Sequence, residues 1–145
     1  MSRASLFLAA ALLAALPAAA DACSVSTAGI AFGAYNPRSA TARDSAGTIN
    51  VDCPRNSDVV ISVSAGRSGT FTQRRMTNGT SNLNYNLFTN AGRSIVLGDG
   101  SGGTATFSIA KLRGAASRTF YGRIPGSQNV SAGAYAETLI VTVSY

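Results

Sequence analysis

The side chains able to do chemistry in this 145-residue chain are few: two cysteines, Cys23 and Cys53, six scattered acids and no histidine. The lack of histidine excludes Ser-His-Asp and Cys-His nucleophiles, and it excludes zinc sites built from histidine and cysteine. The acids stand in no recognisable setting, so we expect surface and turn positions rather than the carboxylate pair of a glycosidase. The sequence therefore predicts no enzyme, no catalytic residue, no metal and no cofactor.

The two cysteines follow a segment with the three parts of a secretory signal peptide. Residues 1–20 contain one basic residue, a central apolar stretch and a closing run of small residues. The apolar stretch is shorter than the roughly 20 residues that cross a bilayer, and no later segment is long enough, so we expect no membrane span. We expect export with cleavage after Ala20, followed by a single domain over residues 21–145.

In an oxidising compartment, an even pair of cysteines usually forms a disulfide. We therefore expect Cys23 and Cys53 to be bonded, which would stabilise the fold by about 3–4 kcal/mol on a chain-entropy account. The alternative is a lipidated Cys23, after a signal of the form Leu-small-small-Cys. Here Ala20-Asp21-Ala22 precedes the cysteine. The leucine is missing, an acid interrupts the motif, and lipidation would leave Cys53 unpaired.

The chain is basic, with a formal net charge of +6. Such a balance raises the question of a nucleic-acid or anionic-surface partner. The basic residues are scattered, however: Arg74 and Arg75 are the only adjacent pair, and no nucleic-acid-binding motif surrounds them. We therefore expect no nucleic-acid partner, and we assign the arginines to solvated strand faces and loop ends.

The elements that position these residues follow a hydrophobic period of two, which is typical of half-buried strands. The longest run is 135–145, where Glu137 interrupts the face shared by the apolar residues. Further strands are predicted over 58–65, 104–112 and 117–124, and shorter ones over 48–53, 83–88 and 94–97. Turn clusters separate these runs, so about seven or eight short strands in an all-β sandwich are expected. The apolar members of the runs should form the core: Val25, Ile30, Phe32, Val51, Val59, Ile61, Val63, Tyr85, Leu87, Phe107, Ile109, Phe120, Leu139, Val141 and Val143.

Several short segments in a fixed order carry a family resemblance. They are Cys23-Ser-Val, Phe32-Gly33 with Tyr35, Ile49-Asn-Val-Asp-Cys53, Arg75-Met76, Leu83-Asn-Tyr85-Asn-Leu87-Phe88, Val96-Leu97-Gly98-Asp99-Gly100, Tyr121-Gly122-Arg123-Ile124-Pro125, and Ala132-Gly133-Ala-Tyr135 through Thr142-Val-Ser-Tyr145. In this order they resemble the spore coat protein U domain family. Two departures are visible, because Leu97 stands where a Trp is common and Glu137 where an Asp is common.

The resemblance implies assembly rather than catalysis. The family is similar to subunits of archaic chaperone–usher pili, whose fold is an incomplete immunoglobulin-like sandwich that lacks its last strand. There a periplasmic chaperone first fills the gap, and the N-terminal extension of the next subunit then replaces it. The partners expected from the resemblance are a periplasmic chaperone, an usher and neighbouring pilus or coat subunits. The expected route runs through the periplasm to the cell surface or the extracellular space.

In such a fold the groove that accepts a partner strand should lie between the last strand and the first. The chain stops at Tyr145 directly after a strand, so we expect no residues for a further one. Only Asp21 and Ala22 remain before Cys23 after cleavage, fewer than the about 10 residues that a donor strand requires. We therefore expect a strand acceptor without an obvious donor; the alternative is a free secreted or tip-located module that binds a surface or sugar. The expected groove residues are Ile30, Phe32, Leu139, Val141 and Val143.

Overall fold

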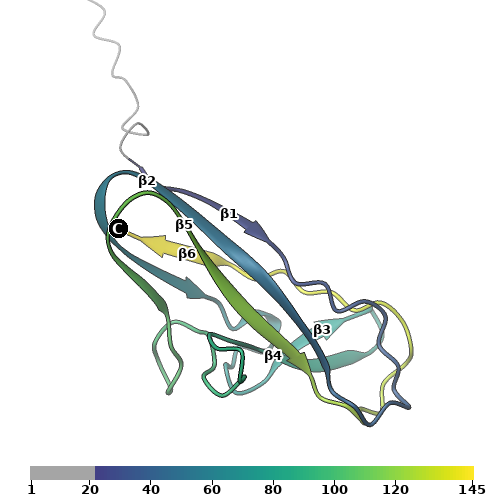
Figure 1. The fold of residues 1–145 in the computed structure, drawn as a ribbon. Helices are drawn as coiled ribbons and strands as arrows, with labels where there is room; N and C mark the ends of the chain where they lie inside the picture. The colour runs from purple at the N-terminus through teal and green to yellow at the C-terminus, as the bar shows by residue number, and fades with distance from the viewer. Residues whose placement is uncertain (1–21) are drawn as a thin grey trace, which may run out of the picture.

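The computed structural model describes residues 22–145, so the expected signal peptide lies outside the described residues. The described chain is built from strands joined by loops, with one short 3-10 turn, η2 (Figure 1). The elements are β1 Ser24–Ala28, β2 Arg43–Val63, η2 Gly66–Ser68, β3 Arg74–Thr77, β4 Asn82–Phe88, β5 Phe107–Ile124 and β6 Val141–Ser144.

Two long strands, β2 and β5, form the spine of the fold. They pair antiparallel from Arg43 opposite Ile124 to Ile61 opposite Phe107, and the register shifts between Cys53 and Ser57. At this irregularity the ribbon folds over, as Figure 1 shows. On β5 the turn is helped by Gly114, whose φ of 86° is favourable for glycine alone. The two halves of the ribbon thereby contribute to two layers.

The sequence predicted separate strands where the structure has one continuous strand that bends. Run 48–53 and all but the last two residues of run 58–65 are parts of the single strand β2, and most of runs 104–112 and 117–124 belongs to β5. The sequence pattern breaks at the bend because the extra residues disturb the alternation, whereas the ladder of paired backbones resumes beyond it. The run 135–145 is also shorter than expected, since β6 is confined to Val141–Ser144.

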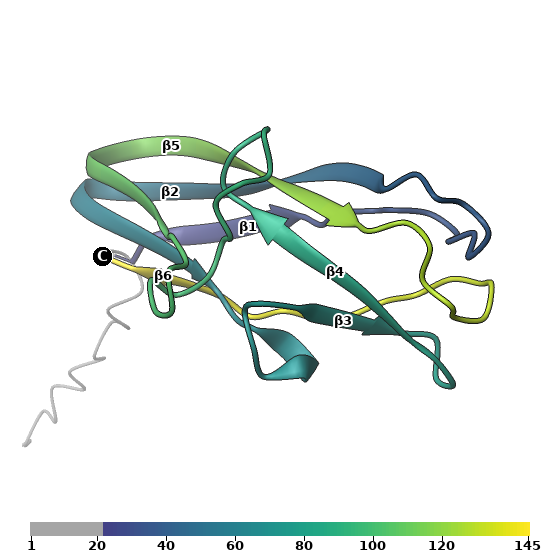
Figure 2. The same cartoon turned by 90° about the horizontal axis from the view of Figure 1, so that it is seen from below.

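The remaining strands pack around this ribbon in the order β1-β2-β5-β4-β3, and β6 pairs with the end of β2. Figure 2 shows β1 with the longer parts of β2 and β5 on one side, β3, β6 and the end of β2 on the other, and β4 crossing between them. Both β1 and β6 pair only with β2, so within residues 22–145 no strand borders their other edges. The fold is thus an all-β, immunoglobulin-like sandwich that lacks a strand, as the sequence predicted.

The core lies between the layers and follows the predicted alternation at most positions. Among the residues expected there, eight are buried: Phe32, Val51, Val59, Ile61, Val63, Tyr85, Leu87 and Phe120. Six others are partly buried and pack against these: Ile30, Phe107, Ile109, Leu139, Val141 and Val143. Val25 was predicted wrongly, because it is 46% exposed. It stands opposite the buried Val51, but β1 is an edge strand and all five of its residues are exposed.

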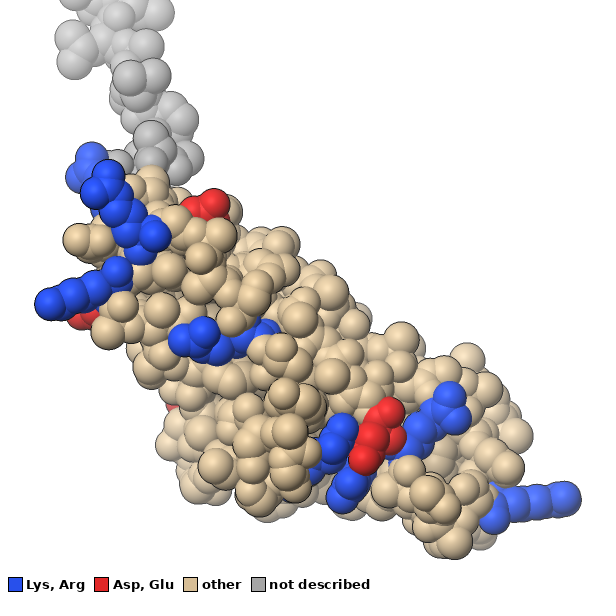
Figure 3. Space-filling model, viewed as in Figure 1, with Lys and Arg blue, Asp and Glu red and all other residues tan. Residues whose placement is uncertain are grey.

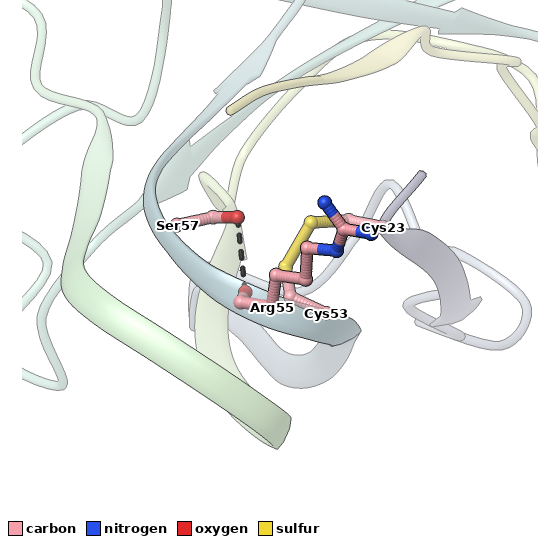
Figure 4. The surroundings of a disulfide bond; sticks show 4 residues. All are labelled: Cys23, Cys53, Arg55 and Ser57. Atoms are coloured by element: carbon pink, nitrogen blue, oxygen red, sulfur yellow. Dashed lines mark hydrogen bonds between the residues drawn. A yellow bond between two sulfur atoms is a disulfide. The ribbon is translucent and has the colours of Figure 1, made fainter. Parts of the chain in front are cut away.

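The two cysteines are joined to each other. Cys23 and Cys53 form a disulfide whose Cα atoms lie 4.2 Å apart. Figure 4 shows that the bond lies at the bend of β2, with Arg55 beside it and the Ser57 hydroxyl donating to the Arg55 carbonyl at 3.1 Å. The disulfide therefore fixes the beginning of the edge strand β1 to the place where the ribbon folds over.

Candidate functional site

A cavity of about 490 Å³ opens between two segments that are distant in sequence. One wall is the N-terminal rim, residues 27–34, and the other is the C-terminal rim, residues 134–141. We call this cavity the groove. Its floor is formed by core residues of the sandwich: Ile49, Val63, Met76, Tyr85, Leu87 and Phe120. The groove therefore reaches into the hydrophobic core at the side where the two layers are not closed by a strand.

The structure places four of the five predicted groove residues around this cavity. Ile30 and Phe32 lie on the N-terminal rim, and Leu139 and Val141 lie on the C-terminal rim. Val143 does not line the cavity; it packs against the core farther along β6. Residues more than 100 positions apart in the sequence thus form the two walls of one apolar groove.

The N-terminal rim rests on a glycine in β5. A Cβ atom at Gly122 would lie 2.4 Å from Cδ1 of Ile30 and 2.5 Å from Cζ of Phe32, closer than real Cβ atoms approach such neighbours. Phe32 also meets Tyr85 edge to face, with 6.2 Å between ring centroids. The absence of a side chain at Gly122 therefore allows both apolar residues to sit close to the sheet.

The C-terminal rim is held by backbone pairing to β3 and to the end of β2. Ala136 and Thr77 exchange N–H to carbonyl hydrogen bonds of 3.0 Å in both directions. The Ser64 N–H donates to the Ile140 carbonyl at 2.9 Å, and the Ile140 N–H donates to the Ser64 hydroxyl at 3.0 Å. The rim is thus an extended segment that continues into β6 and positions Leu139 and Val141 toward the cavity.

One acid, Glu137, lies on the wall of the otherwise largely apolar groove. Its carboxylate accepts hydrogen bonds from the Tyr85 hydroxyl and from the Arg67 backbone N–H, the latter at 2.6 Å. Burial, and then the hydrogen bond to Glu137, raise the pKa of Tyr85 above its ordinary range. Gly66, with a φ of 71°, leaves room for the carboxylate, because a Cβ there would lie 2.2 Å from Oε1 of Glu137.

Arg74 is a charged residue whose position the sequence analysis missed. We expected the arginines on solvated faces, but Arg74 is 0% exposed. Its guanidinium donates at 2.8 Å to the Ser64 carbonyl, the Leu97 carbonyl and Oδ1 of Asn86. Burial lowers its pKa below the usual arginine range. Arg74 and Met76 alternate with exposed Arg75 and are both buried in β3. This spacing could have predicted that Arg74 is buried, but a charged residue is not counted in a hydrophobic pattern.

The other arginines do not gather into one binding surface on the visible face. Figure 3 shows Lys and Arg distributed along the length of the molecule, with acids beside several of them. Arg123 donates to both carboxylate oxygens of Asp44, at 2.7 and 2.8 Å, and Nε of Arg93 lies 3.5 Å from the same carboxylate. The hydrogen bond from Arg123 holds the pKa of Asp44 below its usual value.

Residues 22–145 carry neither a metal-binding cluster nor a membrane-spanning helix. That part of the chain contains no group of three or more Cys, Asp or Glu side chains arranged to hold a metal ion. The same residues include no helix of the length and apolar character that crossing a membrane requires.

The structure is an immunoglobulin-like sandwich that lacks a strand and has an open apolar groove. Comparison of the sequence with protein families identifies the family. The Spore Coat Protein U domain model matches residues 9–142, so the chain belongs to that family and the predicted resemblance is confirmed. No curated protein sequence matches the chain.

A solved structure shares the fold. It is the CsuC–CsuE chaperone–tip adhesion subunit pre-assembly complex from archaic chaperone-usher Csu pili of Acinetobacter baumannii, to which the chain is similar with a TM-score of 0.58 and 20% identity. The match covers 86% of this chain and 39% of that one. The likeness shows the fold, and this chain spans well under half of the chain that it matches.

Proposed function

We propose that the protein is a structural subunit of a surface pilus or coat, assembled by strand complementation. The observation that carries this proposal is the open groove between the two rims. A strand from a periplasmic chaperone fills the groove first, and a strand from a neighbouring subunit replaces it at an usher. Membership of the family supports this account, and so does the likeness to a subunit whose structure was solved in complex with its chaperone.

The backbone of β6 offers the hydrogen bonds that an added strand needs. Ser64 and Ile140 are hydrogen-bonded across the ladder, and hydrogen-bonded pairs alternate with non-bonded pairs in an antiparallel ladder. We therefore infer that Val141 and Val143, between the bonded pairs, turn their N–H and carbonyl groups away from β2. An added strand bonds to these groups, which supplies affinity whatever its side chains are.

The side chains around the groove match the other requirement of strand addition. The inward residues of a strand recur at every second position, and Leu139 and Val141 on one wall face Ile30 and Phe32 on the other. Every second side chain of an incoming strand enters the space between these walls. The apolar walls therefore favour a register in which the apolar residues of the incoming strand point inward. Without such a strand, an apolar hollow and two unpaired edges stay exposed, which favours aggregation.

The proposal also includes the cellular location of the protein and its lack of catalytic activity. Residues 1–20 act as a cleaved export signal, and residues 21–145 form the domain that passes through the periplasm to the cell surface. The protein works by binding and assembly rather than catalysis, and the lack of histidine, which removes Ser-His-Asp and Cys-His nucleophiles, agrees with this.

A peptide titration tests the groove. The exported, purified protein is mixed with an 11-residue peptide of alternating apolar and polar residues, and with a scrambled peptide of the same composition. The alternating peptide should raise the unfolding temperature progressively with the logarithm of its concentration once that exceeds the dissociation constant, as a ligand of the native state does. It should also protect the amides of Val141 and Val143 from hydrogen exchange, whereas the scrambled peptide should do neither.

Two adjacent substitutions provide the matched pair. Val141→Lys places a charge in the groove, and Ile140→Lys places the same charge on an exposed side chain. Only the first should abolish peptide binding and periplasmic complex formation with a co-expressed chaperone. A soluble, stable monomer that neither the peptide nor a chaperone stabilises would contradict strand acceptance. That result would favour the alternative, a free secreted or tip-located module that binds a surface or sugar.

A further inference from the structure

Glu137 is an anion in a groove that is otherwise built for apolar side chains. It is the only charged residue among the described residues that line the groove. Its carboxylate accepts one hydrogen bond at each oxygen, from Tyr85 and from the Arg67 N–H. A carboxylate has about four acceptor positions, so roughly half of its capacity is left for a further donor.

An entirely apolar strand would cover this carboxylate without supplying a donor. Covering an ionised group without a compensating donor costs free energy, and the cost is larger for a charged group than for a neutral one. A strand that fills the groove therefore has one inward position at which an apolar side chain is unfavourable, namely the position that faces Glu137.

The kind of donor follows from the apolar lining of the groove. A cationic side chain placed there would lose its own hydration, and the desolvation cost of a second charge can exceed the attraction to Glu137 that it gains. A neutral donor supplies the missing hydrogen bond at a lower desolvation cost. Arg74, the buried cation of β3, does not supply it, because its guanidinium donates to Ser64, Leu97 and Asn86.

We propose that Glu137 is a specificity-determining residue of the groove, selecting a partner strand with a neutral hydrogen-bond donor, Ser, Thr, Asn or Gln, at the inward position facing it. This inference rests on the proposed strand acceptance and adds a rule for the partner's sequence. It also defines the register. A slip of two residues keeps the same side chains inward but moves the donor away from Glu137 and brings an apolar residue there.

A scan of nearly isosteric peptides tests this rule on the unaltered protein. The parent peptide carries Val at every inward position, and each member of the series replaces one inward Val by Thr. Thr at a single position should tighten binding about tenfold, as expected for a hydrogen bond to a charged group. Thr elsewhere should weaken binding. Lys at the favoured position should bind less tightly than Thr.

Substitution of Glu137 provides the second arm. In Glu137→Met the preference for Thr should disappear, and in Glu137→Gln, which keeps an acceptor oxygen, a reduced preference should remain. The inference is wrong if Thr weakens binding at every inward position of the wild-type groove, or if Lys binds more tightly than Thr. Failure of every peptide, including the parent, to bind the wild-type protein would instead contradict strand acceptance itself.

Discussion

The hydroxyl of Tyr85 donates a hydrogen bond to the carboxylate of Glu137, joining residues 52 positions apart. Tyr85 lies on the floor of the groove and Glu137 on its C-terminal rim. Tyr85 also touches Phe32 of the N-terminal rim edge to face. One buried tyrosine therefore contacts both walls, so the shape of the groove depends on a polar contact as well as on apolar packing.

Removal of this hydroxyl should loosen the C-terminal rim. Tyr85→Phe keeps the ring but leaves Glu137 with the Arg67 N–H as its remaining protein donor. We expect a loss of about 1–3 kcal/mol in the free energy of unfolding, measured by chemical denaturation. Tyr145→Phe is the matched control, since Tyr145 is 58% exposed, and it should leave stability within about 0.5 kcal/mol. Equal effects of the two changes would argue against a role for the Tyr85 hydroxyl.

The disulfide should be a large contributor to stability. It closes a loop with a sequence separation of 30 residues. Replacing both Cys23 and Cys53 by Ala should lower the free energy of unfolding by about 3–4 kcal/mol. Denaturation of the wild-type protein with and without a thiol reductant checks the result, and the reductant should have no effect on the double variant. A wild-type protein that reductant does not destabilise would contradict the prediction.

The buried Arg74 should be far more sensitive than its neighbour in sequence. Arg74→Met leaves the carbonyls of Ser64 and Leu97 and Oδ1 of Asn86 without this donor, and we expect a loss of about 1–3 kcal/mol for each buried acceptor left unpaired. Arg75→Met changes an exposed residue of the same strand and should alter stability by less than about 0.5 kcal/mol. Periplasmic yield and unfolding midpoint provide the measurements. Similar unfolding midpoints for both variants would contradict the prediction, because they would show that other groups satisfy the acceptors that Arg74 binds.

The close approach at Gly122 should make that position intolerant of a side chain. In Gly122→Ala the new methyl group meets Ile30 and Phe32, so the N-terminal rim has to move and stability should fall by about 1–3 kcal/mol. Gly29→Ala is the control, because a Cβ there has no neighbour within 4 Å. Peptide affinity should fall together with stability in the first variant. A stable Gly122→Ala protein with unchanged affinity would contradict the packing described for this rim.

The Asp44 carboxyl should titrate at an unusually low pH. Its hydrogen bond with Arg123 lowers the pKa of Asp44 in the folded state. The pair therefore contributes stability above the ordinary carboxyl pKa of about 3.9, and the contribution is lost as the pH falls through the folded value. NMR titration should show the low midpoint, and Arg123→Gln should return it toward the ordinary value. Arg118→Gln, which removes an arginine that has no contact with Asp44, should leave the midpoint unchanged.

The sequence by itself determined the class of the fold, the disulfide and the family. Alternation with a period of two is a local property, and it places Val59, Ile61 and Val63 on one buried face whatever the strand pairs with. Two cysteines permit only one intramolecular pairing. The order of short motifs along the chain was sufficient for the family, because their spacing is set by the same strands and turns.

Only the tertiary structure decided how these parts meet. Alternation cannot show that a ladder continues through a bend, so β2 and β5 each appeared as two strands. Burial depends on what lies across from a residue, which is why Val25 on an edge strand is exposed and Arg74 is enclosed by Ser64 and Leu97. The sequence placed Glu137 on the inward face. Its contact with Tyr85 required the sandwich to fold, because the free energy of a buried polar pair is set by partners that are distant in sequence.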